Sequence, residues 1–95
     1  MYYYDERTIL KQNISTCYNL DMINENEFKQ IVARNITILR KTNGLTQLEL
    51  AEKLNYSDKA ISKWERGESL PDVYMLQVIA EMFGVTLNDL ISEQT

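Results

Sequence analysis

Charged and hydroxyl side chains are concentrated in the short segment from Ser57 to Arg66. Within it, Ala60, Ile61 and Trp64 fall at spacings that place them on one face of a helix. That leaves the polar side chains for solvent or a ligand: Ser57, Asp58, Lys59, Ser62, Lys63 and Arg66. Lysine can donate hydrogen bonds to O6 and N7 of guanine, and aspartate can accept one from N4 of cytosine. The segment therefore has the chemistry needed to contact the edges of base pairs.

Some of these residues have a second interpretation. Asp58 fits equally well as a carboxylate stabilised by the positive end of a helix dipole. Trp64 can stack on a base, but its spacing favours the core. Tyr56 and Tyr74 are likewise predicted to be packing residues whose hydroxyl ends stay exposed.

The composition offers few routes to catalysis or to metal binding. The chain has 95 residues, no histidine and a single cysteine, Cys17. It therefore lacks the usual general base, most zinc-ligand sets and any internal disulfide. No glycine-rich phosphate loop is present either. We expect a protein that is not an enzyme and uses no metal or cofactor.

The charges are unevenly distributed along the chain. The formal net charge is −4, yet residues 28–70 carry eight lysines and arginines against five acidic residues. Residues 71–95 carry four acidic residues and no basic ones, and residues 1–27 are also acidic on balance. A ligand responds to the charges within roughly one Debye length, ~10 Å at moderate salt. The acidic total therefore does not exclude DNA as a partner of the middle segment.

The sequence has no apolar run near the ~20 residues of a membrane span. Its first residues also lack the basic and then apolar pattern of a signal peptide. We expect a cytoplasmic protein that associates with the nucleoid when it is bound to DNA.

Helical spacing of apolar residues predicts an all-α fold with five helices between residues 28 and 92. The first, over 28–42, ends at Gly44 and buries a stripe made of Phe28, Val32, Ile36 and Leu39. Thr46 and Glu49 form a capping box for the second helix. Asn55 tolerates the positive φ of a sharp turn, and Ser57 caps the third helix.

The last two helices are bounded by equally clear signals. The fourth begins at Pro71 or Asp72 and ends before Gly84. Its predicted buried side chains are Val73, Leu76, Ile79, Ala80 and Phe83. Thr86 and Asp89 cap a short fifth helix that contributes Leu87, Leu90 and Ile91. Residues 93–95 are a tail.

These elements carry a specific set of residues: the segment 39–47, Leu50 with Ala51, the segment 61–67, Pro71, and Ile79 with Ala80. In type and spacing they resemble the lambda-repressor-like family of bacterial regulators, also called the Cro/C1-type or xenobiotic-response-element family. The resemblance covers residues 28–92, with the helix-turn-helix over 47–67. One departure is Asn55, where many members have glycine; asparagine supports the same backbone geometry.

The resemblance implies a role for several side chains. The third helix would enter the major groove with four base-facing residues: Ser57, Asp58, Lys59 and Lys63. Gln47 would hydrogen-bond a phosphate beside the helix N-terminus, or else be a solvated helix-start glutamine. Further contacts to the DNA backbone would come from Arg40, Lys41, Ser62 and Arg66, although surface lysines and arginines are often only solvated. Arg40 would also pair with Glu65 and brace the third helix against the first.

Residues 1–27 form a candidate N-terminal extension. Helical spacing relates Ile9 or Leu10 to Ile14, Cys17 and Tyr18, and tyrosine occupies positions 2–4. Several apolar residues of the domain lie off its main stripes and need cover: Ile31, Ile38, Met75, Val78 and Met82. We expect the extension to be partly helical and to pack on the domain or on a second protomer. The alternative is a partly disordered leader before a domain that begins near Met22.

Family resemblance favours sequence-specific binding of double-stranded DNA, with the chain acting as a repressor on a short palindromic operator. A two-fold dimer would place two recognition helices one DNA turn apart, ~34 Å, since one module alone buries little surface. A second possibility is a protein-interaction module of the same fold, as in antitoxins or antirepressor-binding regulators. Its partner would bind apolar patches that include Ile31, Ile38, Met75 and Met82.

Overall fold

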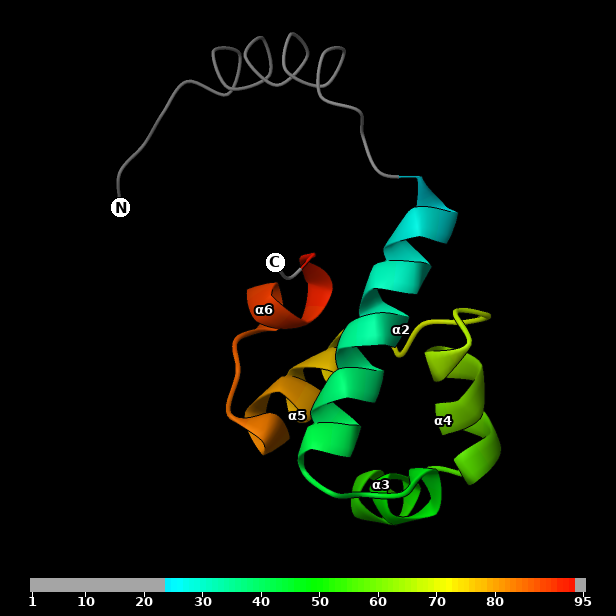
Figure 1. The fold of residues 1–95 in the computed structure, drawn as a ribbon, viewed down its shortest axis with the longest axis vertical. Coiled ribbons are helices and arrows are strands. Elements are labelled where there is room, and N and C mark those ends of the chain that lie inside the picture. The colour runs from blue at the N-terminus through cyan, green and yellow to red at the C-terminus, as the bar shows by residue number, and fades with distance from the viewer. Residues whose placement is uncertain (1–23, 94–95) are drawn as a thin grey trace, which may run out of the picture.

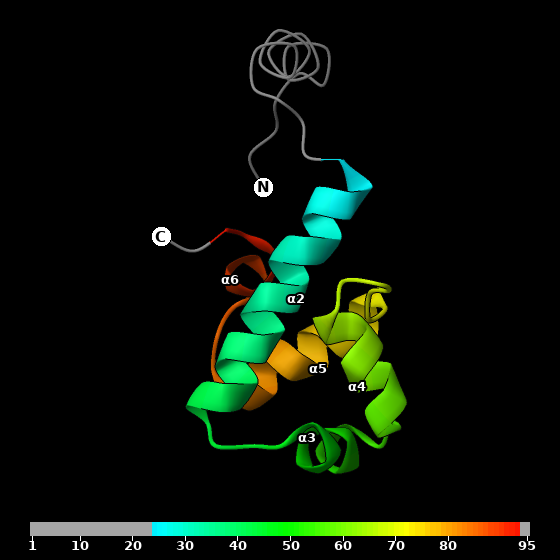
Figure 2. The same ribbon diagram turned by 45° about the vertical axis from the view of Figure 1, so that its right-hand side comes forward.

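The computed structural model describes residues 24–93, which form five α-helices and no strand. The long helix α2 (Glu25–Thr42) runs through the middle of the domain. The helices α3 (Gln47–Leu54) and α4 (Asp58–Glu65) follow it, and then α5 (Val73–Phe83) and α6 (Leu87–Ile91). Figures 1 and 2 show α4 and α6 on opposite sides of α2, with α3 beyond its C-terminal end. The predicted all-α fold is confirmed.

The first helix begins earlier than its apolar stripe predicts. Asn24 is its cap, because the Asn24 side chain accepts a hydrogen bond of 2.8 Å from the Glu27 backbone N–H. The Glu27 carboxylate in turn accepts one from the Asn24 backbone N–H, which completes a capping box. Residues 24–27, which the sequence places in the extension, thus form the cap and the first turn of α2. The rest of the predicted extension, residues 1–23, lies outside the described residues.

The caps predicted inside the domain are present. Thr46 and Glu49 exchange hydrogen bonds of 2.8 and 3.0 Å at the start of α3. Asn55 ends that helix in the left-handed region at φ 60° and ψ 43°. Asp72, and not Pro71, caps α5 by accepting a hydrogen bond from the Met75 N–H. The turns are thus set by local hydrogen bonds that the sequence encodes.

All five helices contribute to one core. Its fully buried side chains include one or more from each helix: Val32, Ile36, Leu50, Ile61, Ile79 and Leu90. Trp64 is buried as predicted, and Tyr56 lies against it with 5.2 Å between ring centroids. Among the described residues, no helix is both long and apolar enough to span a bilayer.

Four apolar residues lie differently from the prediction. Val73 and Tyr74 were expected to pack, but each is 74% exposed. They occupy the first turn of α5, where side chains point back past the helix N-terminus and away from the core. Conversely, Ile31 and Met75 are buried, because α2 and α5 use a face wider than the single stripe predicted for each. Neither belongs to an exposed patch.

Candidate nucleic-acid interface

The α3–turn–α4 unit is rigidly built from α3, α4 and three connecting residues. At the turn, the N–H groups of Asn55 and Tyr56 donate to the carbonyls of Glu52 and Ala51, at 3.2 and 2.8 Å. Leu50 of α3 and Ile61 of α4 are both completely buried in the core shared with α2. This packing fixes the angle between α3 and α4, and so fixes which side chains of α4 stay outside.

The four residues predicted to face bases are all exposed at the start and along one side of α4: Ser57, Asp58, Lys59 and Lys63. Ser57 is also the helix cap, since its Oγ accepts a hydrogen bond of 3.2 Å from the Ala60 N–H. Its hydroxyl proton remains available to donate. Asp58 lies in the first turn, where a carboxylate is favoured whether or not DNA is bound.

A buried ion pair connects α2 to α4. Arg40 donates from Nε to Glu65 Oε2 at 2.6 Å and from Nη2 to Glu65 Oε1 at 2.9 Å. The third donor of the guanidinium, Nη1, reaches the Leu45 carbonyl at 2.8 Å. The pair that the family resemblance implies is therefore present, and its contact is bidentate.

The glutamine at the start of α3 joins this pair. Gln47 Nε2 donates to Glu65 Oε1 at 3.0 Å, so Arg40, Glu65 and Gln47 form one network between α2, α4 and α3. We call these three residues the brace. One hydrogen of the Gln47 amide is used in this contact, and the second can still donate to an anion. The N–H groups of the first α3 residues lie beside it.

The brace also sets the ionisation of its members. Burial disfavours the charge of Glu65, but hydrogen bonds from Arg40 and Gln47 outweigh burial and hold the pKa of Glu65 below its usual value. The hydrogen bond to Glu65 raises the pKa of Arg40 against the opposing effect of burial. Both groups are thus charged at neutral pH.

The residues predicted to contact the DNA backbone lie in three different environments. Lys41 is exposed near the end of α2. Arg66 is exposed but engaged, because it donates to the Glu68 carboxylate at 2.7 Å and to the Ser62 hydroxyl. Arg40 is buried and each of its three nitrogens donates one hydrogen bond within the domain, so its predicted contact with a phosphate stays a prediction.

Comparison with known proteins also identifies a helix-turn-helix in this part of the chain. A family model described as Helix-turn-helix matches residues 36–90, more than half of the chain. The chain belongs to the helix-turn-helix family. The HTH-type transcriptional activator BcrR of Enterococcus faecalis is 46% identical over 54 residues, which are 57% of this chain and 26% of BcrR. Antitoxin PezA of Streptococcus pneumoniae serotype 4 is 35% identical over 63 residues, 66% of this chain and 40% of PezA.

A solved structure gives the fold. The SOS-response transcriptional repressor LexA from Eubacterium rectale superimposes with a TM-score of 0.70 and 26% identity, and the match covers 78% of each chain. The domain is therefore of the lambda-repressor-like type. The chain spans less than half the length of BcrR and of PezA, so the likeness to them concerns the helix-turn-helix domain.

Two features of this helix-turn-helix domain were missed by sequence reasoning. The first is the hydrogen bond from Gln47 to Glu65, which ties the predicted phosphate anchor to the brace. No local spacing signals it, because the two residues lie on different helices. The second is Glu68, whose position two residues after Arg66 did offer a signal for an ion pair.

Proposed function

We propose that this helix-turn-helix domain binds double-stranded DNA in a sequence-specific manner and regulates transcription by occupying an operator. One observation carries the proposal: α4 exposes a row of polar side chains while the brace fixes its orientation relative to the N-terminus of α3. A helix held in this way fits the major groove, whose width admits one α-helix. The names of BcrR and LexA, a transcriptional activator and a repressor, support the same class of function.

Gln47 and the exposed residues of α4 would have different roles in binding DNA. Gln47, with its second amide hydrogen and the neighbouring backbone N–H groups, would bind a phosphate and set the register of the domain on DNA. Lys59 and Lys63 would then contact bases, with guanine as the preferred partner because it offers two acceptors in the major groove. Ser57 and Asp58 would contact the bases nearest the start of α4. Lys41 would add a phosphate contact.

The proposed regulator is a cytoplasmic repressor that acts as a homodimer on an approximate palindrome. A single domain of this size buries little surface on DNA, and two copies related by a two-fold axis double the length of sequence that is read. Footprinting on selected sites would show two half-sites about one helical turn apart. A single unpaired half-site would contradict the dimer but not DNA binding.

The deciding experiment is selection of bound fragments from random double-stranded DNA, followed by affinity measurements at several salt concentrations. We expect an enriched motif and an affinity that falls steeply with salt, since phosphate contacts release counterions. Lys59→Ala and Lys63→Ala should each weaken binding to the selected site by ~1–3 kcal/mol and relax the preference at one position. Gln47→Ala should weaken binding to all sequences alike.

Arg34→Ala is the matched control for charge, because Arg34 is exposed on α2 and lies beside Glu93, which follows α6. It should leave both affinity and motif unchanged. No binding even at low salt, or an unchanged motif in both lysine variants, would reject α4 as the recognition helix.

A second candidate function is a protein-interaction module, which the similarity to antitoxin PezA supports. Of the four apolar residues predicted to receive a partner, Ile31 and Met75 are buried, Met82 is partly buried against the core, and Ile38 is 51% exposed. The surface left for a protein partner is thus smaller than the sequence suggests. Absence of DNA binding in the salt series would favour this candidate.

A further inference from the structure

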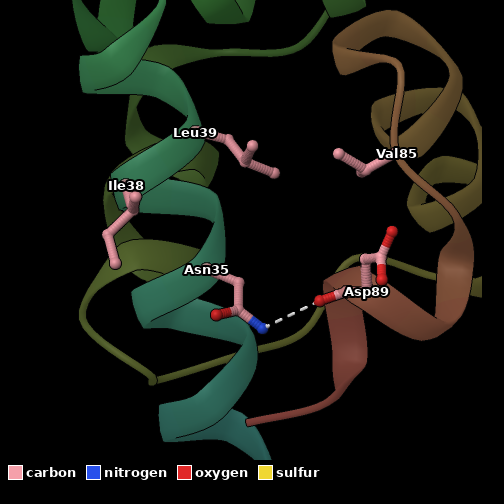
Figure 3. A pocket seen from close by; sticks show the side chains of 5 residues that line it. All are labelled: Asn35, Ile38, Leu39, Val85 and Asp89. Atoms are coloured by element: carbon pink, nitrogen blue, oxygen red, sulfur yellow. Dashed lines mark hydrogen bonds between the residues drawn. The ribbon is translucent and has the colours of Figure 1, made fainter. Parts of the chain in front are cut away.

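The polar contacts on the two sides of α2 differ in what lies beside them. On the α6 side, the amide of Asn35 adjoins an apolar hollow of about 340 Å³ (Figure 3), lined by Asn35, Ile38, Leu39, Val85 and Asp89. Figures 1 and 2 place α6 on the opposite side of α2 from α4. Directly after α4, by contrast, an exposed ion pair joins Arg66 to Glu68. This pair, and not the hollow, adjoins the proposed recognition helix.

The ion pair between Arg66 and Glu68 is a forked contact. Arg66 donates from Nε to Glu68 Oε2 at 2.7 Å and from Nη2 to Glu68 Oε1 at 3.2 Å. The remaining nitrogen, Nη1, donates to the Ser62 hydroxyl. Ser62 and Arg66 are both among the residues predicted to contact the DNA backbone. Each nitrogen of the Arg66 guanidinium thus donates within the domain when no DNA is bound.

The backbone after α4 fixes the position of Glu68 relative to Arg66. The Gly67 N–H donates to the Trp64 carbonyl at 3.1 Å and the Glu68 N–H to the Lys63 carbonyl at 2.9 Å, which is the pattern of a Schellman motif. This turn needs the left-handed φ of 75° at Gly67, which glycine adopts without a steric penalty. The pair therefore follows from the way α4 ends and forms without a ligand.

The Arg66–Glu68 pair is open to solvent, unlike the pair in the brace. Its two side chains are 52% and 53% exposed, whereas those of Arg40 and Glu65 are 11% and 7% exposed. An exposed ion pair contributes little to stability, so breaking it costs little. A guanidinium binds a phosphate with the same forked geometry as a carboxylate. Arg66 can therefore exchange Glu68 for a phosphate without disturbing the core.

Glu68 is ionised and lies among the charges proposed to face DNA. The hydrogen bond from Arg66, together with the charge of Lys63, holds the pKa of Glu68 below its usual value. The exposed charged side chains of residues 58–68 are three basic and two acidic ones: Lys59, Lys63 and Arg66, against Asp58 and Glu68. Glu65, the remaining charged residue of this stretch, is paired with Arg40 in the brace. An ionised Glu68 thus lowers the positive charge available to DNA phosphates.

We propose that Glu68 competes with DNA for Arg66, and that the Arg66 guanidinium exchanges the Glu68 carboxylate for a phosphate when the domain binds DNA. This exchange rests on the proposed function and adds to it a residue that weakens DNA binding. A phosphate contact carries no sequence information, so Glu68 weakens binding to every sequence alike. A site must then also supply the base contacts of α4 to be bound tightly.

The test is a double-mutant cycle of Glu68→Gln and Arg66→Ala, measured as affinity for random and for selected double-stranded DNA at low salt. Glutamine keeps the shape of the side chain and removes its charge. Glu68→Gln should tighten binding about two- to five-fold more with Arg66 present than in the Arg66→Ala background, where there is no pair to break. The selected motif should not change. Arg66→Ala alone should weaken binding to all sequences and lower the salt slope by about one.

Glu52→Gln is the matched control, because it removes the same charge from an exposed residue of α3. Its effect on affinity should be the same with and without Arg66. Both glutamine variants should keep a Tm close to that of the native chain, since exposed charges contribute little to stability. A change in affinity would then not reflect loss of the fold.

NMR of the Arg66 side chain reports the exchange itself. The signal of its Nε–H should shift when Glu68→Gln breaks the pair in the free chain, and also when DNA is added to the native chain. Equal effects of Glu68→Gln in both Arg66 backgrounds, or an Arg66 signal that DNA leaves unchanged, would overturn the exchange and leave the proposed function standing. A changed motif at the base contacted by Lys63 would assign Glu68 to Lys63 and would also overturn it. A native chain that binds no DNA even at low salt would reject both.

Discussion

The two sides of α2 hold their neighbouring helices by different kinds of polar contact. On one side, the ionised pair of Arg40 and Glu65 fixes α4 and extends to Gln47. On the other, the neutral amide of Asn35 fixes α6 by donating to backbone carbonyls. A charged pair is directional and reaches the side chains at the proposed DNA surface, whereas the amide contact ends at the backbone. We infer that the brace is built for orienting a binding helix and the Asn35 contact for closing the core.

The largest expected effect comes from breaking the brace. Arg40→Ala leaves the buried Glu65 carboxylate without its charged partner and should lower the free energy of unfolding by about 3 kcal/mol. DNA affinity should fall as well, since Gln47 and α4 lose their common anchor. Denaturant unfolding and a binding titration measure the two effects.

A double replacement separates the effect of the brace on stability from its effect on the orientation of α4. Arg40→Met with Glu65→Leu removes both charges and should recover most of the stability, because apolar residues of similar volume can replace a buried pair. We expect its DNA affinity to stay low. Full recovery of affinity would show that the brace does not orient the recognition helix.

A smaller effect is expected on the other side of α2. Asn35→Ala removes the donor to two close carbonyls at the end of α6 and should cost about 2 kcal/mol of unfolding free energy. Amide hydrogen exchange should rise within α6 first, while DNA affinity stays unchanged. Gln77→Ala, at an exposed residue of α5 that bonds Glu81, is the control. A loss of DNA affinity in Asn35→Ala would contradict the division between the two sides.

The smallest effect is the response to acid, and it should be larger on the α4 side of α2 than on the α6 side. The pKa of Glu65 is lowered in the folded chain, so its contribution to stability is present above the unfolded pKa of about 4.3 and is lost as the pH falls below it. Asn35 does not titrate. Below about pH 4, exchange protection should therefore fall more in α4 than in α6. Glu65→Gln should abolish this difference, and a difference that persists in the variant would exclude Glu65 as its source.

Much of the fold follows from short-range patterns that need no tertiary information. The caps Thr46, Ser57 and Thr86 bond within three residues of their own helix. Asn55 adopts positive φ for reasons intrinsic to its side chain. Helical spacing likewise placed Ile36, Leu50 and Ile61 in the core. These predictions succeeded because each depends on neighbours along the chain.

The predictions that failed concern burial, which depends on how the helices pack against one another. Val73 shares the spacing of a buried stripe but projects beyond the end of α5, and Tyr74 is exposed beside it. Ile31 lies off the main stripe of α2 but is buried. Periodicity gives the direction in which a residue faces and says nothing of whether another helix is there to cover it.

By itself, the sequence determined five helices, the caps Thr46, Ser57 and Thr86, the family and the row of polar residues on α4. Tertiary structure alone decided that Gln47 is tied to Glu65, that Arg40 is buried, and that Ile38 lines a hollow beside α6. The physical reason is the range of the interactions. Caps and periodicity act within one or two helical turns, whereas the brace and the hollow join residues that meet only when the helices pack.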